Sequence, residues 1–491
     1  MAKAARAYRM YIDGKWVDAA SGATTALPNP ATEETVAIVP DAGREDMQRA
    51  ILAARRAFDE GPWPKSNKHE RARVLHQIAD GIEQRKEEFR QVLVAAHATE
   101  YLTHQVQLDT PIQLLRHYAD LALRFEFEEL LPVESLATPM GPMVVTSMAY
   151  RQPVGVCGMI PTWNFPLFVS VQKLVPALAT GCTMVFKPSP FGPLVDLLLA
   201  EVVEQSDLPA GVYNVVCGES HELGMELTES PYIDKLSFTG SVSTGKRVME
   251  AASRTLKRVH LELGGKSALI ILDDCELGAT APGAASPTYF HAGQGCAMHT
   301  RVLVGRARHD ELLENMSGFV KNFVKVGDPA DPKVILGPVI REERRQSIER
   351  YIESGQEQGA DLVCGGGRPK DLSKGYFLEP TIFGNVRNDM RIAQEEILGP
   401  VVSVIPFEDE EDAVRIANDS SYGLSGGILT NDTTKALAMA KRLRTGGVMI
   451  NNANNLLHAP FGGFKESGIG REGGMWGMHE YTEVQAINWK A

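Results

Sequence analysis

Apolar side chains recur at the spacing of an α-helix through the first part of the chain. One such face runs over residues 45–58 and consists of Met47, Ala50, Ile51, Ala54 and Phe58. A second runs over residues 74–89 and consists of Val74, Leu75, Ile78, Ile82 and Phe89. A third helical stretch covers residues 105–127. The pattern therefore predicts three helices before residue 130.

Two segments have the pattern of β-hairpins. Residues 8–18 place two short strands around Asp13-Gly14, a pair that favours a tight hairpin turn. Residues 130–150 place β-branched residues on both sides of a Pro-Met-Gly-Pro turn, which predicts a projecting hairpin.

From residue 154 onwards short apolar runs alternate with helical stretches. Strands are predicted at residues 154–160, 182–186, 212–217, 235–238 and 259–263, with helices between them at 168–178, 194–205, 221–228 and 244–255. The pattern returns after Cys296, with strands at residues 301–304, 401–406, 424–429 and 448–450. Such alternation is typical of βαβ units on a parallel sheet. The chain is therefore predicted to form two α/β lobes and one β extension.

Composition and charge narrow the classes of function. Hydrophobic residues make up 44% of the 491 residues and charged residues 23%, which excludes disorder or a coiled coil as the main organisation. The 62 acidic and 50 basic side chains give a formal net charge of −12, so nucleic acids and anionic membranes are not expected as partners. The chain shows neither the apolar core of a secretory signal nor a long apolar span, and a cytoplasmic location is expected.

Six cysteines are spread along the chain without the paired spacing of a zinc site, and no metal is expected. Cys296 differs from the others because it lies among small residues, in Ala292-Gly293-Gln294-Gly295-Cys296-Ala297. Small neighbours leave a thiol open to a substrate. A free thiol with a pKa of about 8.5 is a few per cent thiolate at neutral pH, which already makes it a competent nucleophile. The alternative is a cysteine buried as a small hydrophobic residue.

Three further segments carry polar groups that a reaction could use. Glu262 lies in an apolar strand that two glycines follow. It is a general base with a raised pKa, an exposed edge residue, or a partner of Lys266. Asn164 follows a predicted strand, as a turn residue or as a donor to an oxyanion. The turn Phe238-Thr239-Gly240-Ser241 opens a helix, as in loops that bind a pyrophosphate.

Together these segments resemble the NAD(P)-dependent aldehyde dehydrogenase superfamily over nearly the whole chain. The matching motifs, in the family's order, are Trp163-Asn164-Phe165-Pro166, Phe186-Lys187-Pro188-Ser189, Phe238-Thr239-Gly240-Ser241, Leu261-Glu262-Leu263-Gly264-Gly265-Lys266, Gly293-Gln294-Gly295-Cys296, Glu395-Glu396-Ile397-Leu398-Gly399-Pro400 and Pro460-Phe461-Gly462-Gly463-Phe464-Lys465. The resemblance implies an aldehyde dehydrogenase-like α/β fold with a β-hairpin extension. Its implied parts are a Rossmann-type NAD(P)-binding domain (residues 1–129 and 149–261), a catalytic domain (262–460) and elements that form a homodimer or homotetramer (130–148 and 461–491).

The resemblance also implies the reaction, which is oxidation of an aldehyde to its carboxylic acid. Cys296 would attack the aldehyde carbon, and the Asn164 side chain with the Cys296 backbone amide would hold the oxyanion. Hydride transfer to the nicotinamide would leave a thioester, which water activated by Glu262 would hydrolyse. Lys173 and Glu472 match positions through which the family passes the proton of the base to solvent. For these two the alternative is an ordinary surface ion pair.

The implied cofactor is NAD, and NADP stays open. The positions that match the family's cofactor site are Ile160, Pro161, Thr162, Trp163, Lys187, Ser189, Pro190, Gly218, Phe238, Thr239, Gly240, Ser241, Leu263, Gly264, Glu396 and Leu398. Three of them depart from the family's pattern. Pro190 stands where NAD-preferring members often carry Glu, Leu398 replaces an aromatic residue, and Thr162 replaces a proline.

The residues expected to line the substrate tunnel are His291, Gly295, Met298, Leu457 and Phe461, together with His299 and the rest of the loop 454–458. They include no arginine cluster, so the expected substrate is an uncharged aldehyde, aromatic or medium-chain aliphatic. Three alternatives stay open. They are a CoA-acylating aldehyde dehydrogenase, a non-catalytic scaffold that retains the fold, and a cysteine hydrolase that needs no nicotinamide.

Overall fold

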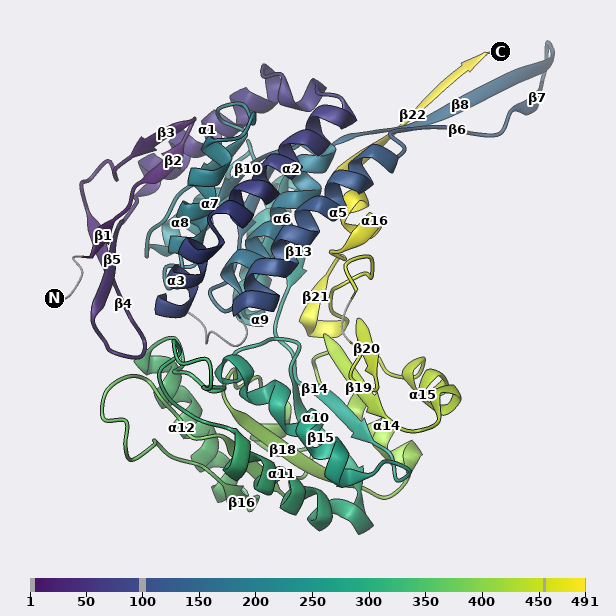
Figure 1. Ribbon diagram of the computed structural model, residues 1–491. Coiled ribbons are helices and arrows are strands. Elements are labelled where there is room, and N and C mark those ends of the chain that lie inside the picture. The colour runs from purple at the N-terminus through teal and green to yellow at the C-terminus, as the bar shows by residue number, and fades with distance from the viewer. Residues whose placement is uncertain (1–4, 97–102, 454–455, 491) are drawn as a thin grey trace.

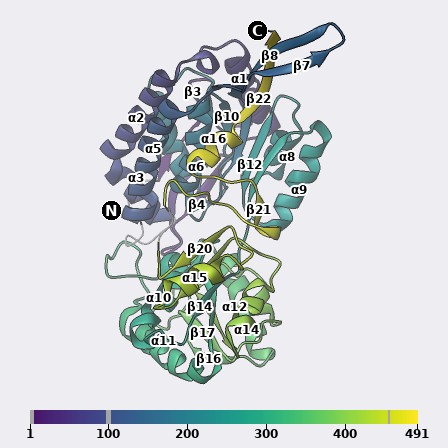
Figure 2. The ribbon, with the colours of Figure 1, turned by 90° about the vertical axis from the view of Figure 1, so that its right-hand side faces the viewer.

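The structure, a computed structural model, describes residues 5–96, 103–453 and 456–490. Two α/β lobes lie one above the other, and a long β extension projects from the upper lobe (Figure 1). The two lobes stay separate when the molecule is turned by 90° (Figure 2). The predicted organisation of two lobes and one extension is confirmed.

The upper lobe contains an eight-stranded sheet with the order β21-β13-β12-β9-β10-β11-β2-β3. Its central strands are parallel: β13 (Arg258–Glu262), β12 (Lys235–Thr239), β9 (Val156–Ile160), β10 (Thr183–Phe186) and β11 (Tyr213–Val215). The predicted N-terminal hairpin, β2 (Met10–Ile12) and β3 (Lys15–Val17), joins one edge antiparallel, and β21 (Gly468–Ile469) joins the other. A small sheet of β1 (Arg6–Ala7), β5 (Thr35–Pro40) and β4 (Thr24–Pro28) lies beside them.

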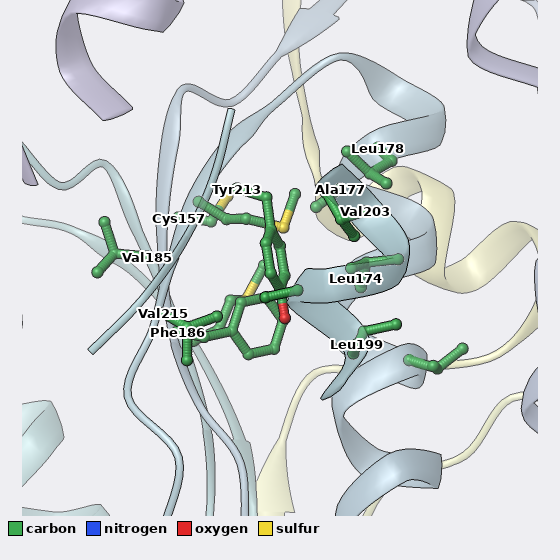
Figure 3. Close-up of a cluster of buried hydrophobic side chains, with 14 of the residues drawn as sticks. Cys157, Leu174, Ala177, Leu178, Val185, Phe186, Leu199, Val203, Tyr213 and Val215 are labelled. Carbon is green, nitrogen blue, oxygen red and sulfur yellow. The ribbon is translucent and has the colours of Figure 1, made fainter. Parts of the chain in front are cut away.

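Helices cover both faces of this sheet. One layer consists of α1 (Arg44–Asp59), α8 (His221–Glu229) and α9 (Val242–Ala252). The other consists of α2 (Lys68–Gln84), α3 (Lys86–Ala96), α5 (Thr110–Arg124), α6 (Pro166–Thr180) and α7 (Leu194–Glu204). In Figure 3, Leu174 and Leu178 of α6 and Leu199 of α7 face Phe186 and Tyr213 of the sheet. Because α6 is apolar almost all round and buried, its one cation, Lys173, lies inside the core.

Two predicted helices differ from the observed ones. The stretch 74–89 is not one helix, since α2 ends at Gln84 and α3 begins at Lys86. The break is at Arg85, whose guanidinium pairs with Glu88 and Glu201. The stretch 105–127 is α5 only from Thr110, after a π-helical turn over Thr103–Asp109. Pro111 explains the start of α5, because a proline without an N–H is tolerated in the first turn of a helix.

The lower lobe contains a seven-stranded sheet with the order β16-β17-β18-β15-β14-β19-β20. Its strands are β16 (Asp361–Cys364), β17 (Thr381–Gly384), β18 (Val401–Phe407), β15 (His299–Gly305), β14 (Ser267–Ile271), β19 (Ser425–Leu429) and β20 (Gly447–Ile450). The helices packed around them are α10 (Leu277–Tyr289), α11 (His309–Phe323), α12 (Glu342–Glu357), α13 (Arg391–Gln394), α14 (Glu410–Asn418) and α15 (Thr433–Ala440). The predicted strands correspond to β15, β18, β19 and β20, whereas β14, β16 and β17 were not predicted.

The extension is a sheet of β22 (Thr482–Lys490), β8 (Gly141–Pro153) and β6 (Glu128–Leu130), with β7 (Glu134–Thr138) paired to β8. The hairpin of β7 and β8 projects from the upper lobe, as predicted (Figure 1). Apolar side chains of the extension are left exposed; Met140, between β7 and β8, is 99% exposed, and Leu130 of β6 is 72% exposed. The helix α16 (Gly474–Glu480) precedes β22. No helix within the described ranges is long and apolar enough to cross a membrane.

Candidate active site

Cys296 lies in the loop between a 3-10 turn (Phe290–Gly293) and β15, and it lines a cavity together with residues of both lobes. The loop is turned by three consecutive residues in the left-handed region, His291, Ala292 and Gly293, with φ of 56°, 52° and 70°. A glycine is required at the third, since an added Cβ would lie 2.1 Å from the carbonyl oxygen of Gly399. Gly265 is equally constrained, because its Cβ would lie 2.2 Å from the Cys296 carbonyl oxygen. The loop after β13 is thereby packed directly against the Cys296 loop.

Two cavities of similar size meet at Cys296. One, the apolar cavity, has a volume of about 590 Å³, and the other, the polar cavity, has about 600 Å³. Cys296 lines both. Its thiol is therefore reachable from two sides.

The apolar cavity is lined mainly by large hydrophobic side chains, among them Leu114, Phe165, Phe168, Met449, Leu457 and Phe461. None of its lining residues within the described part of the chain is Asp, Glu, Lys or Arg. His299 is neutral there, because burial lowers its pKa to about 4. Of the predicted tunnel residues, Gly295, Met298, His299, Leu456, Leu457 and Phe461 line this cavity. His291 and His458 do not, and Asn454 and Asn455 lie outside the described residues.

The polar cavity lies at the N-terminus of α9. Ser241 caps this helix by accepting a hydrogen bond from the Thr244 N–H (3.3 Å). On the opposite side, Glu396 accepts a hydrogen bond from the Gly265 N–H (3.0 Å), and burial raises the pKa of Glu396 to about 7. A Cβ on Gly264 would lie 2.3 Å from a Glu396 carboxylate oxygen, so that glycine keeps the space beside Glu396 open.

The predicted cofactor residues divide into two groups. Those that line the polar cavity are Thr162, Trp163, Thr239, Gly240, Ser241, Leu263, Gly264, Glu396 and Leu398. Those that do not line it are Ile160, Pro161, Lys187, Ser189, Pro190, Gly218 and Phe238. The sequence reasoning missed Lys246, Arg344, Ser347, Tyr351 and Tyr422, which also line it. Lys246 could have been found one turn after the Ser241 cap, whereas Arg344 comes from α12 and has no local signal.

Asn164 is buried and fixed from several directions. Its Nδ2 donates a hydrogen bond to the Gln294 carbonyl (2.7 Å), and its Oδ1 accepts one from the Phe165 N–H (3.1 Å). Its own carbonyl lies 2.5 Å from His291 Nε2, and burial lowers the pKa of His291 to about 4. His291 thus supports the Asn164 loop. The amide of Asn164 is held against the Cys296 loop.

The thiol of Cys296 is not the partly ionised group expected from the sequence. Burial, followed by the charges of Glu396 and Glu262, raises its pKa to about 12. The backbone amides of Cys296 and Ala297 act in the opposite direction on the same sulfur. The expectation of a few per cent thiolate at neutral pH is therefore wrong for this site, and the nucleophile needs a base.

Glu262 is the last residue of β13 and is 4% exposed. Burial and the neighbouring charge of Glu472 raise its pKa well above the usual range of a carboxyl. Neither carboxylate oxygen has a hydrogen-bond partner in the described part of the structure, and the same is true of Lys266 Nζ. Glu262 is therefore neither an edge residue nor paired with Lys266, and it lines the polar cavity.

Lys173 and Glu472 form a buried ion pair rather than a surface one. Lys173 Nζ lies 3.0 Å from Glu472 Oε1 and donates a second hydrogen bond to Ser237 Oγ (2.9 Å). The two side chains are 0% and 3% exposed. A buried pair of this kind is costly to desolvate and is weak evidence for a purely stabilising role. Among the described residues, no group of three or more His, Cys, Asp or Glu could hold a metal ion.

The chain is similar to known proteins over nearly its whole length. The model of the aldehyde dehydrogenase family matches residues 16–487. A betaine aldehyde dehydrogenase of Bacillus subtilis is 39% identical over 492 residues, which cover 98% of this chain and 99% of that protein. The crystal structure of a Mycobacterium tuberculosis aldehyde dehydrogenase complexed with NAD+ has a TM-score of 0.93 and 42% identity, covering 99% of this chain and 98% of that one. A mutant of aldehyde dehydrogenase C from Pseudomonas syringae, complexed with NAD+ and octanal, has a TM-score of 0.92 and 38% identity, covering 98% and 96%.

Proposed function

The chain belongs to the aldehyde dehydrogenase family, and we propose that it oxidises an uncharged aldehyde, aromatic or medium-chain aliphatic, to its carboxylic acid with NAD+. The observation that carries the proposal is the position of Cys296, which lines the apolar and the polar cavity at once. A single sulfur can then hold the aldehyde carbon from one side while an electron acceptor approaches from the other.

The residues of the polar cavity fit a nicotinamide dinucleotide. The amides at the start of α9, capped by Ser241, favour a pyrophosphate, and Lys246 adds a cation nearby. The Glu396 carboxylate can accept hydrogen bonds from ribose hydroxyls in the space that Gly264 leaves open. When bound, NAD+ supplies the acceptor for the hydride that leaves the attacked carbon. Two of the related structures described above are themselves complexes with NAD+. Pro190 supplies no carboxylate to repel a 2′-phosphate, so NADP belongs in the same assays.

The first step is formation of the carbon–sulfur bond. With its pKa near 12, the Cys296 thiol must lose its proton as it attacks, and this proton passes to water in the polar cavity, so that Glu262 stays a free base for the second step. The oxygen of the aldehyde becomes an oxyanion. Asn164 Nδ2 and the Cys296 N–H are the donors for it, and preorganised donors of this kind stabilise the tetrahedral centre.

The second step is hydrolysis of the thioester that remains on Cys296 after oxidation. A carboxylate whose pKa is raised by burial is a stronger base than an exposed one, so Glu262 can take a proton from water. The resulting hydroxide attacks the thioester carbon, the same two donors hold the new oxyanion, and Cys296 leaves as a thiolate. This role for Glu262 favours water over CoA as the acyl acceptor.

The substrate class follows from the walls of the apolar cavity. An aldehyde with a carboxylate or phosphate would bring an anion among Leu114, Phe168 and Leu457 with no cation to pair it. The octanal in the related Pseudomonas syringae complex is an aldehyde of the proposed kind. A quaternary ammonium aldehyde is the main competitor, because aromatic rings can bind such cations and phenylalanines line this cavity.

We also propose roles for the parts of the fold. Residues 1–129 and 149–261 hold the cofactor, and residues 262–460 carry the catalytic lobe. Residues 130–148 and 461–491 form the contacts of a dimer or tetramer. The exposed apolar side chains of β7, β8 and β22 support the last assignment.

The test is NADH or NADPH formation with octanal, benzaldehyde, succinic semialdehyde and betaine aldehyde, for the wild type and Cys296→Ala, with and without CoA. We expect Cys296-dependent turnover of octanal and benzaldehyde to the free acids, with rates at least about tenfold below these for the two charged aldehydes. Equal turnover of succinic semialdehyde would overturn the substrate class. Acyl-CoA as the product would overturn the hydrolytic step.

A further inference from the structure

His260 is a buried polar residue for which the reaction outlined above has no role. It lies on β13 two residues before Glu262, and alternate residues of a strand share a face, so both side chains point to the same side of the sheet. The imidazole is 1% exposed. Neither ring nitrogen has a hydrogen-bond partner in the described part of the structure. Burying an imidazole without partners is costly, and an apolar side chain could fill the same space without that cost.

The ring lies between two carboxylates. Its Nε2 is 3.6 Å from Glu262 Oε1 and 3.5 Å from Glu472 Oε1. Glu472 is the carboxylate that Lys173 holds at 3.0 Å from the other side. A small movement of either carboxylate would bring it into hydrogen-bonding distance of Nε2. His260 is therefore placed to exchange a proton with both.

The other ring nitrogen faces a glycine and a partly exposed acid. A Cβ on Gly470 would lie 2.3 Å from His260 Nδ1 and 3.1 Å from Glu480 Oε1, so only a glycine leaves the ring this room. The side chain of Glu480 is 28% exposed, and it pairs with Lys235 at 3.2 Å. The Nδ1 side of the ring is thus the side nearer to solvent.

Charged groups surround His260 from every element packed against it. The cations are Lys173 of α6, Lys235 of β12 and Arg471, and the acids are Glu262, Glu472 and Glu480 of α16. Burial, followed by the charges of Lys173, Lys235 and Arg471, lowers the pKa of His260 well below its usual range. The resting ring is therefore neutral with a lone pair on one nitrogen, and its protonated form is disfavoured and short-lived.

We propose that His260 is a positioning residue that carries the proton of Glu262 to Glu472, so that Glu262 is returned to its basic form in each turnover. The proposal rests on the assignment of Glu262 as the base that activates water. The ring starts with its proton on Nδ1. The O–H bond on Glu262 breaks as an N–H bond forms on Nε2, which leaves Glu262 a carboxylate and the ring an imidazolium. The Nε2–H bond then breaks as Glu472 Oε1 takes the proton, and the ring is neutral again. Glu472 gives this proton up to water before the next turnover, which restores the carboxylate that pairs with Lys173.

The sequence of events predicts which step depends on His260. Acylation and the first hydride transfer produce a burst of NADH before the thioester is hydrolysed. That burst does not require the proton on Glu262 to leave, whereas every later turnover does. Loss of His260 should therefore spare the burst and slow the steady state.

The experiment is stopped-flow and steady-state NADH formation with octanal from pH 6 to 10, in H₂O and D₂O, for the wild type, His260→Leu and His260→Gln. His309→Gln is the matched control, because His309 is a buried histidine of the lower lobe that accepts a hydrogen bond from the Asn385 N–H and lines neither cavity. We expect burst rates within twofold of the wild type in all variants. We expect steady-state kcat to fall about 100-fold in both His260 variants, since proton transfer by a placed group contributes about 100-fold or more. The rising limb of the plot of kcat against pH should shift to higher pH in both variants. The solvent isotope effect on kcat should increase.

Two controls distinguish failure of the role proposed for His260 from failure of the proposed aldehyde oxidation. Glu262→Gln should show the burst but almost no steady state; absence of a burst in the wild type, or full turnover by Glu262→Gln, would contradict the proposed function itself. If the burst and the Glu262→Gln result hold, but both His260 variants keep the wild-type pH limb and isotope effect, the role of His260 is overturned. A lower kcat with unchanged pH limb and isotope effect would show that His260 only packs. His260→Gln retains polar side-chain atoms at the site if His260→Leu fails to fold.

Discussion

The two cavities that meet at Cys296 have nearly the same volume and opposite chemistry. The polar cavity, of about 600 Å³, carries Glu262, Glu396, Lys246 and Arg344 on its walls. The apolar cavity, of about 590 Å³, has no charged side chain among its described lining residues. Under the proposed function, recognition of the charged dinucleotide and of the aldehyde is divided between these two sets of walls, and the sulfur of Cys296 is shared by both. Each prediction below tests this division by changing the shared cysteine, a residue beside it, a wall of the apolar cavity or the pH.

Removing the sulfur of Cys296 should have the largest effect on turnover. Cys296→Ala deletes the sulfur but leaves the walls of both cavities, so we expect kcat/KM for octanal to fall by at least about 1000-fold. NAD+ binding, measured by calorimetry, should change less than about threefold. A variant that loses nucleotide binding as well would mean that the cavity has collapsed, and Cys296→Ser is the milder control.

Removing the oxyanion donor should cost somewhat less. Asn164→Ala deletes the Nδ2 that faces the Cys296 loop, and loss of one such donor typically costs about 100- to 1000-fold in kcat. The burst rate should fall with kcat, because the donor acts in acylation. His291→Ala would move the same loop indirectly, and a loss as large as that of Asn164→Ala would mean that position, not donation, matters.

Placing a charge in the apolar cavity should change its substrate preference from uncharged to charged aldehydes. In Leu457→Arg an unpaired cation lines the aldehyde site, so we expect kcat/KM for octanal to fall about 10- to 100-fold and turnover of succinic semialdehyde to rise. Leu437→Arg is the matched control, since Leu437 lies on α15 with half its surface exposed. An unchanged substrate profile in Leu457→Arg would contradict the assignment of the apolar cavity.

The titration of the shared sulfur should appear in the pH profile. The pKa of Cys296 is about 12 and that of Glu262 is raised, and both groups act in their deprotonated forms. The active fraction therefore grows as pH increases toward these pKa values, by at most about tenfold per unit for each ionisation. The burst rate should rise from pH 6 to 9. A rate that falls over this range would contradict the account.

Parts of this arrangement could be predicted from the sequence because they depend on local signals. The alternation of apolar runs with helices identified β9 to β13 and their parallel sheet, and Asp13-Gly14 identified the first hairpin. The strands β14 and β17 were missed although they are buried on both sides like β10 and β19, which were predicted. The helix break at Arg85 was missed because its partner Glu201 comes from a distant helix.

The candidate site shows the same limit. Glu262, Asn164 and Cys296 stood out through their neighbours in the sequence, and the structure brings all three to the meeting point of the two lobes. The pKa of the Cys296 thiol could not be predicted, because Glu396 approaches it from another segment. Nor could the position of His291, whose left-handed backbone directs the ring to Asn164 rather than into the apolar cavity.

The central claim is that one sulfur serves both cavities, and trapping the intermediate on it tests that claim most directly. Glu262→Gln would be mixed with octanal and NAD+, quenched in acid and digested, and its cysteine peptides analysed by mass spectrometry. The account predicts an octanoyl thioester on the peptide that contains Cys296, formed only when both octanal and NAD+ are present. An acyl group on any other cysteine, or none on Cys296 while NADH is formed, would contradict it.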